Sequence, residues 1–121
     1  MSSLSSLLIP SFLSKTTEVE TNIQYKIELN FKATVQAVYV EKNQFRIERF
    51  YSNLWVRDVP TSIKNLKSIK LKAFINTSNL NYKGEVILSI NINNNLVSQK
   101  TFSLDFGQNY SEWLILNYDF E

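Results

Sequence analysis

The chain has 121 residues, a formal net charge of +2, 44% hydrophobic residues and 20% charged residues. This composition is typical of one folded domain with its own core rather than of a disordered chain. Because histidine and cysteine are both absent, disulfides, thiolate or imidazole metal sites and Ser-His or Cys-His catalysis are excluded. We therefore expect a protein that is not an enzyme and that has neither a cofactor nor a metal.

Residues 1–20 are predicted to form an arm ahead of the domain. The arm is rich in serine and has its first basic residue at Lys15, so it lacks the basic start of a secretory signal. A signal peptide, a loosely ordered tail and an apolar arm that docks on a partner are the alternatives. Without a convincing signal or a stretch that could span a membrane, we expect a location inside the cell, a virion or another assembly. The candidate docking residues of the arm are Leu4, Leu7, Leu8, Ile9, Phe12 and Leu13.

The strongest pattern in the sequence begins at Ile23 and ends at Tyr39. Nine consecutive odd positions are apolar or aromatic, whereas the positions between them are mostly polar. This period of two predicts a β-strand with one buried face. Since strands usually have about 5–6 residues, we expect either a long bent strand that serves two neighbours or a projecting ribbon.

The middle of the chain continues with shorter strand patterns. A polar break at residues 41–44 predicts a turn, and Phe45 and Ile47 continue the alternation on odd positions, which predicts a return strand over residues 44–51. A further apolar piece covers residues 54–59 and ends at Pro60, which cannot donate to a ladder. Residues 61–67 are predicted as a connector, and the strand period resumes from Ile69 to Ile75.

The last third of the chain predicts three more strands. Alternation from Tyr82 to Ile92, three asparagines at 93–95 and a return strand to Phe106 are typical of a hairpin, because asparagine tolerates positive φ. A closing strand is predicted over residues 112–121. Both of its faces carry apolar residues, so we expect it to be central in its sheet or covered by a partner.

Six or seven strands without a convincing helix predict an all-β fold in residues 21–121. We expect a single antiparallel β-sandwich with jelly-roll or immunoglobulin-like connectivity. A small closed β-barrel is the alternative, and a barrel would allow an apolar ligand inside.

The charges are segregated along the chain. Residues 1–41 balance to −1, residues 42–83 to +7 and residues 84–121 to −4. The basic middle and the acidic end either meet within the fold or form complementary faces that attract neighbouring copies. Lysines 64, 67, 70 and 72 either extend a basic binding face or protect an edge strand from pairing with other chains.

Two groups of residues are candidate ligand or interface sites. Arginines and aromatic residues alternate between residues 46 and 57, which is typical of surfaces that bind single-stranded nucleic acid, although the same residues also suit a strand whose aromatics fill the core. Tyr and Trp residues also suit a platform for sugar rings or ordinary packing at a sheet rim. The candidates from both groups are Arg46, Arg49, Tyr51, Trp55, Arg57, Tyr110 and Trp113.

Carboxylates are the remaining acid-base groups, and Asp105, Glu112, Asp119 and Glu121 show no spacing that predicts a catalytic pair or a calcium loop. The sequence therefore favours a structural or assembly protein, such as a subunit of a virus particle or a phage tail, with self-association or protein partners. A carbohydrate-binding module is the first alternative, and a protein that binds single-stranded nucleic acid is the second.

Overall fold

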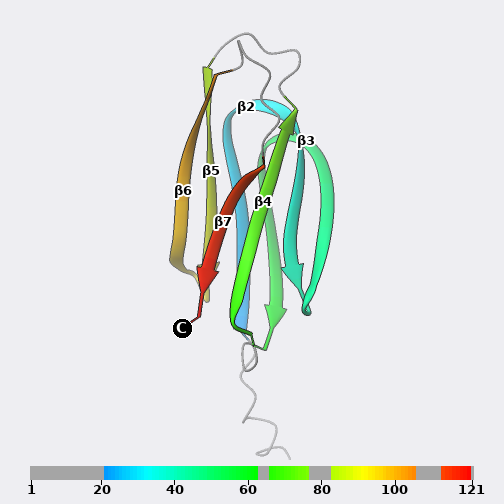
Figure 1. The fold of residues 1–121 in the computed structure, drawn as a ribbon, viewed down its shortest axis with the longest axis vertical. Coiled ribbons are helices and arrows are strands. Elements are labelled where there is room, and N and C mark those ends of the chain that lie inside the picture. The colour runs from blue at the N-terminus through cyan, green and yellow to red at the C-terminus, as the bar shows by residue number, and fades with distance from the viewer. Residues whose placement is uncertain (1–20, 63–65, 77–82, 106–112, 121) are drawn as a thin grey trace, which may run out of the picture.

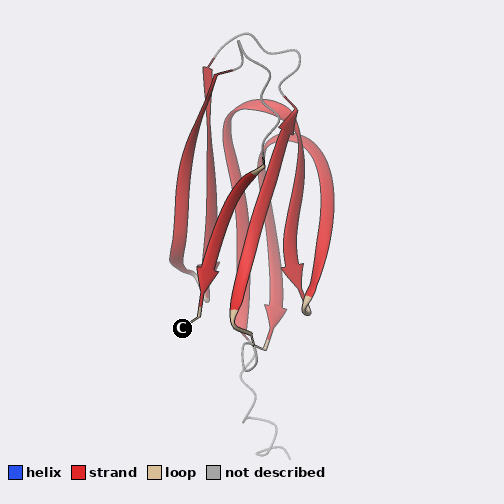
Figure 2. Ribbon diagram, in the orientation of Figure 1, coloured by secondary structure: helices blue, strands red, loops and turns tan. Residues whose placement is uncertain are grey.

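A computed structural model describes residues 21–62, 66–76, 83–105 and 113–120 of the chain. These residues form six antiparallel strands and no helix (Figure 2), which confirms the predicted all-β fold. The strands are β2 (Thr21–Glu41), β3 (Gln44–Thr61), β4 (Ser68–Asn76), β5 (Lys83–Ile92), β6 (Asn95–Asp105) and β7 (Leu114–Asp119). The predicted arm (residues 1–20) and Tyr110 lie outside the described residues.

The sheet is organised by the bent hairpin of β2 and β3 (Figure 1). β3 pairs with β2 along almost the whole length of both strands. On its other edge, β2 pairs with β5 over Ile23–Leu29 and with β4 over Thr34–Tyr39. The prediction of a long bent strand that serves two neighbours is therefore confirmed. The strand order is β6-β5-β2-β4-β7, with β3 beside β2.

The bend folds this sheet into two layers that nearly close into a barrel (Figure 1). The first layer contains β6, β5, the first half of β2 and the second half of β3. The second layer contains the first half of β3, the second half of β2, β4 and β7. The outer strands approach each other where the Ser98 hydroxyl donates to the Asn117 carbonyl oxygen at 3.1 Å.

The bend lies at an irregularity in the pairing of β2 with β3. Glu28 pairs with Leu54 and Ala33 pairs with Ser52, so residues 29–32 of β2 oppose Asn53 of β3. Such an insertion bends a strand locally. Here β2 has four residues where β3 has one, a difference of three, which is odd. The inward-facing odd residues of β2 therefore pair with even residues of β3 before the bend and with odd residues of β3 after it. Glu48 and Arg57 therefore both point into the space between the layers.

Two tight turns connect the hairpins. Lys42 and Asn43 have φ of 54° and 63°, and Asn93 and Asn94 have φ of 51° and 69°. Positive φ at both central residues is the feature of the type I′ turn, which matches the right-handed twist of antiparallel strands. Both predicted turns are confirmed.

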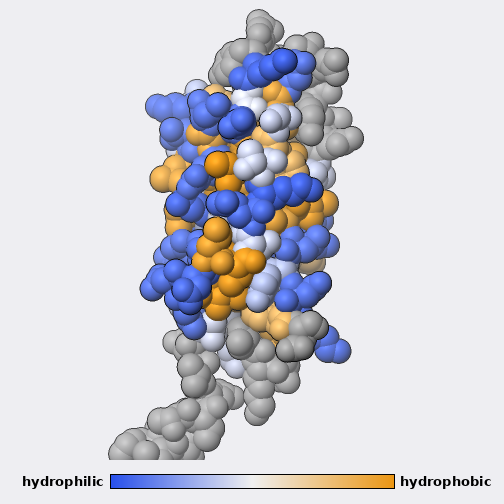
Figure 3. Space-filling model, turned by 90° about the vertical axis from the view of Figure 1, so that its left-hand side faces the viewer, coloured by the Kyte–Doolittle hydropathy of each residue, from blue (hydrophilic) through white to orange (hydrophobic). Residues whose placement is uncertain are grey.

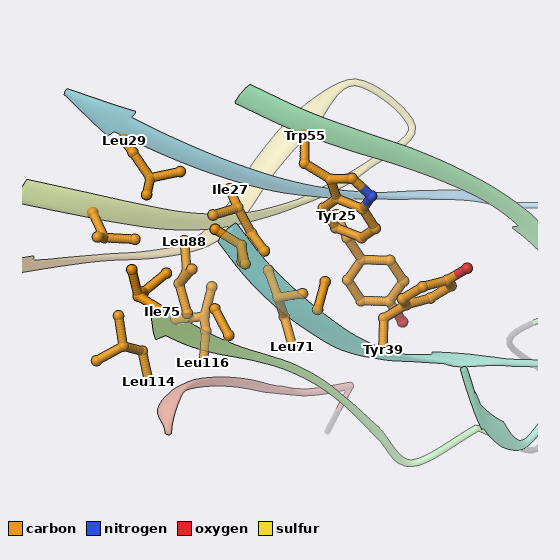
Figure 4. Packing of buried hydrophobic residues seen from close by; sticks show 14 of the residues in the cluster. Tyr25, Ile27, Leu29, Tyr39, Trp55, Leu71, Ile75, Leu88, Leu114 and Leu116 are labelled. Atoms are coloured by element: carbon orange, nitrogen blue, oxygen red, sulfur yellow. The ribbon is translucent and has the colours of Figure 1, made fainter. Parts of the chain in front are cut away.

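The core lies between the two layers. Every odd residue of β2 from Thr21 to Tyr39 is buried, as the alternation predicts. Figure 4 shows that Tyr25, Tyr39 and Trp55 lie together in one part of the core, whereas aliphatic residues such as Leu114 and Leu116 fill another part. The Tyr25 hydroxyl donates to the Val40 carbonyl oxygen at 2.8 Å and so joins the two halves of β2.

Two predictions about the strands differ from the structure. Among the described strands β7 is the last in the order and pairs with β4, so its placement in the centre of a sheet is wrong. The predicted pieces 44–51 and 54–59 are one continuous strand, β3. The two-residue turn pairs Val40 with Phe45 and Val38 with Ile47, so the apolar odd residues of this part of β3 face outward.

Candidate functional site

The outer face of the second layer exposes large apolar side chains from two strands, β3 and β7, and from the residue before β7. Phe45, Ile47, Tyr51, Trp113 and Ile115 are each between 39% and 68% exposed. The register places Ile47, Val38, Lys72 and Ile115 in one row across β3, β2, β4 and β7, and places Arg49, Gln36 and Phe74 in the next row. We call this surface the aromatic face. Contiguous apolar surface of this kind usually marks an interaction site.

Lys72 lies in the middle of the aromatic face. Its ammonium group lies 5.9 Å from the ring centroid of Phe45 and 5.9 Å from that of Trp113. A cation within about 6 Å of an aromatic face is attracted by the ring quadrupole. Trp113 also packs against Phe74 with ring centroids 5.4 Å apart. The Lys72 ammonium group is therefore surrounded by aromatic and branched aliphatic groups.

A shallow groove of about 350 Å³ crosses the same face. It is lined by Thr34, Gln36, Arg49, Phe74 and Asn76. The Arg49 guanidinium donates to the Gln36 side-chain oxygen at 3.3 Å, which fixes two polar groups at the groove. With Phe74 at the groove and Trp113 packed against Phe74, this part of the face combines an apolar wall with hydrogen-bonding groups, the usual composition of a small-ligand site.

A second cluster lies between the two halves of β3, where the Glu48 and Arg57 side chains are 28% and 45% exposed. One carboxylate oxygen of Glu48 accepts a bond from the Tyr39 hydroxyl at 2.7 Å and forms an ion pair with Arg57. The other oxygen accepts from the Trp55 indole nitrogen at 3.0 Å. Phe50 stacks on Trp55 with ring centroids 5.9 Å apart. These contacts hold the two halves of β3 together.

The electrostatics of this cluster follow from burial and from the ion pair. Desolvation works to raise the pKa of Glu48, but hydrogen bonds from Arg57, Trp55 and Tyr39 outweigh it, and the pKa lies below its usual value. Burial and the neighbouring Glu48 carboxylate raise the pKa of Tyr39 to about 12. At neutral pH the Tyr39 hydroxyl is therefore protonated and the Glu48 carboxylate is charged and paired with Arg57. These groups stabilise the fold.

The outer face of the first layer is more polar, and we call it the polar face. Asp58 accepts bonds from the side-chain amides of Asn22 and Gln24 at 3.2 Å and 3.1 Å. Lys26 and Glu28 form an ion pair at 2.7 Å. From the side of the molecule that carries β6, hydrophobic residues form several small areas separated by hydrophilic ones (Figure 3). The two outer faces of the molecule therefore differ in chemistry.

The seven candidate residues are divided between surfaces. Arg49, Tyr51 and Trp113 lie on the aromatic face. Trp55 is 8% exposed and belongs to the core, and Arg57 faces inward to Glu48. Arg46 forms an ion pair with Glu41 at 3.5 Å. Tyr110 lies outside the described residues. The structure therefore brings neither the three arginines nor Tyr51 with Trp55 onto one surface.

The aromatic face also contains residues that were not selected as candidates from the sequence. Phe45, Ile47, Phe74 and Ile115 belong to it, and at its centre stands Lys72, for which the sequence left open a basic binding face or the protection of an edge strand. For Phe45 and Ile47 the sequence contained a signal of outward exposure. They alternate at odd positions of β3, and β3 pairs with β2 so that these positions lie beside the outward-facing even residues of β2. Recognising this signal requires the turn parity that pairs odd residues of β2 with even residues of β3.

Within the described ranges, no group of three or more acidic residues is arranged to hold a metal ion. No helix in the described part of the chain is long and apolar enough to cross a membrane. Comparisons with protein-family models, with curated proteins and with solved structures found no match.

Proposed function

We propose that this protein is a non-enzymatic subunit of a multi-copy structure and that it binds a second copy of itself through the aromatic face. The observation that carries the proposal is the group of large apolar side chains exposed on that face on either side of Lys72. Trp and Tyr anchors around one charged group are typical of the energetic centres of interfaces. A virus particle or a phage tail is the kind of assembly that we expect.

The β3 edge of the sheet is built against strand addition, which supports association through the aromatic face at this edge. Among the described strands β3 pairs with β2 alone. It carries the inward-facing charges Glu48 and Arg57 and also Pro60, and its pairing with β2 is interrupted at the bend. Inward charges, proline and irregular pairing are the features with which natural edge strands resist pairing with other chains.

The experiment is a measurement of absolute mass by light scattering after size exclusion over a range of protein concentrations. We expect the native chain to form species heavier than its 14.1 kDa monomer. Replacing Ile47 and Ile115 together by threonine keeps β-branched residues in both strands but removes apolar surface from the face. Each substitution removes roughly 1 kcal/mol of the favourable free energy that the contact gains by burying apolar surface. The dissociation constant is therefore expected to rise at least ~10-fold.

The control is Lys100→Thr, which places the same residue type at an exposed position of β6 whose partner on β5 is the buried Leu88, off both outer faces. This variant is expected to associate like the native chain. A native chain that stays monomeric at every concentration would contradict the proposal, as would equal loss of association in the control.

The groove gives one specific observation in favour of a second function, carbohydrate binding. Sugar rings present apolar faces that stack on aromatic rings and hydroxyl groups that bond to amides and guanidinium groups, and both kinds of group are present at Phe74, Gln36 and Arg49. The variant Trp55→Phe leaves Trp113 as the one tryptophan of the chain, so its emission reports on the groove. Emission that is unchanged by a panel of glycans would count against this function.

A further inference from the structure

The polar face contains a row of residues whose chemistry complements the centre of the aromatic face. The register places Leu54, Glu28 and Ile87 side by side across β3, β2 and β5. Leu54 is exposed, and Val56 beside Lys26 in the next row is exposed as well. The Glu28 carboxylate thus lies between aliphatic groups on one outer face, whereas the Lys72 ammonium group lies between apolar groups on the other.

The charges of the two faces are opposite in sign. The aromatic face carries Arg49, Lys70 and Lys72 against Asp119. The polar face carries Glu28, Asp58, Glu85 and Asp105 against Lys26 and Lys83, and Lys26 is already paired to Glu28. Complementary potentials favour an interface and fix its register, whereas like charges brought together cost several kcal/mol. Contact between two aromatic faces would bring the basic groups of both copies together.

We propose that the aromatic face of one copy docks on the polar face of the next copy, with Lys72 directed at Glu28. This inference rests on the proposed self-association and names the surface that receives the aromatic face. Because the two surfaces lie on opposite layers of one molecule, the contact is heterologous. Each copy added leaves a free aromatic face at one end and a free polar face at the other, so a stack or a ring results.

Charge reversal tests this pairing. Lys72→Glu and Glu28→Lys are each expected to raise the dissociation constant at least ~10-fold, because each places like charges in the contact. The double variant Lys72→Glu with Glu28→Lys restores opposite charges between neighbouring copies. We expect its dissociation constant to return to within about threefold of the native value. Lys100→Glu, which makes the same change of net charge away from the Lys72 and Glu28 rows, is the control and is expected to have little effect.

The outcomes separate this inference from the proposed function. If the native chain associates and the Ile47 and Ile115 variant does not, but Glu28→Lys associates normally, the aromatic face docks elsewhere and the inference is overturned. Failure of the double variant to recover while it remains folded by circular dichroism also overturns it. If the native chain is a monomer at all concentrations, both the inference and the proposed function fail.

Discussion

At the scale of single residues, Glu48 shows how the fold determines what a charged side chain does. Its carboxylate lies between the two halves of β3 and accepts bonds from Tyr39, Trp55 and Arg57. The sequence places Glu48 and Arg57 nine positions apart in an arginine-rich run and gives no sign that they meet. Their pairing depends on the bend, which reverses the inward parity of β3, and such an insertion leaves no local pattern.

Replacing Glu48 by glutamine is expected to destabilise the fold at neutral pH by about 1–2 kcal/mol, because Tyr39, Trp55 and Arg57 then lose the charged acceptor that they share. The pKa of Glu48 is lowered on folding. Its charge therefore contributes stability that is present above the pKa of the unfolded chain and is lost as pH falls through the lower folded pKa. The free energies of unfolding in urea of the native protein and of Glu48→Gln, compared at pH 7 and near pH 3, measure this loss of stability.

The control for this prediction is Glu41→Gln, which removes an ion pair of similar exposure, with Arg46 at 3.5 Å, that has no share in the Tyr39 and Trp55 hydrogen bonds. Exposed pairs contribute about 0–1 kcal/mol, so this variant is expected to remain close to the native protein. Equal losses for Glu41→Gln and Glu48→Gln, or a loss for Glu48→Gln that is as large at pH 3 as at pH 7, would show that Glu48 does not act through its charge.

At the scale of elements, the sequence predicts the strands better than their faces. The alternation from Ile23 to Tyr39 predicts β2, and the asparagines predict the turn after β5, where Asn93 and Asn94 adopt positive φ. The position of the bend was not predictable, because Leu29, Phe31 and Ala33 stay buried through it and the period continues without a break. The break lies in the pairing of β3, which sequence periodicity does not report.

The candidate site was predictable in part for the same reason. Trp113 and Ile115 stand out in the sequence as apolar residues opposite the buried residues of β7, and both are exposed on the aromatic face. Phe45 and Ile47 gave an equally clear alternation, but the assignment of that alternation to the inside or the outside depends on the turn at Lys42 and Asn43. One two-residue turn thus decides whether two large apolar residues stabilise the core or are available to a partner.

At the scale of the whole molecule, the segregation of charge along the chain becomes a difference between two outer faces. β3 and β4 come from the basic middle of the sequence, and they place Arg49, Lys70 and Lys72 on the aromatic face. β5 comes from the acidic part and places Glu85 on the polar face. Because the faces belong to opposite layers, their charges do not neutralise each other within one copy and are available between copies.

The arm is expected to add to this association, because six apolar side chains between Leu4 and Leu13 have no charged residue among them. Replacing these six residues by serine keeps the length of the chain and removes the apolar surface that a neighbouring copy would bury. We expect the dissociation constant measured by light scattering to rise at least ~10-fold. The urea midpoint is expected to stay near the native value, since the described core begins at Thr21 and is closed by β2 to β7. An unchanged dissociation constant would show that the aromatic and polar faces associate without the arm, whereas a lower urea midpoint would show that the arm belongs to the fold.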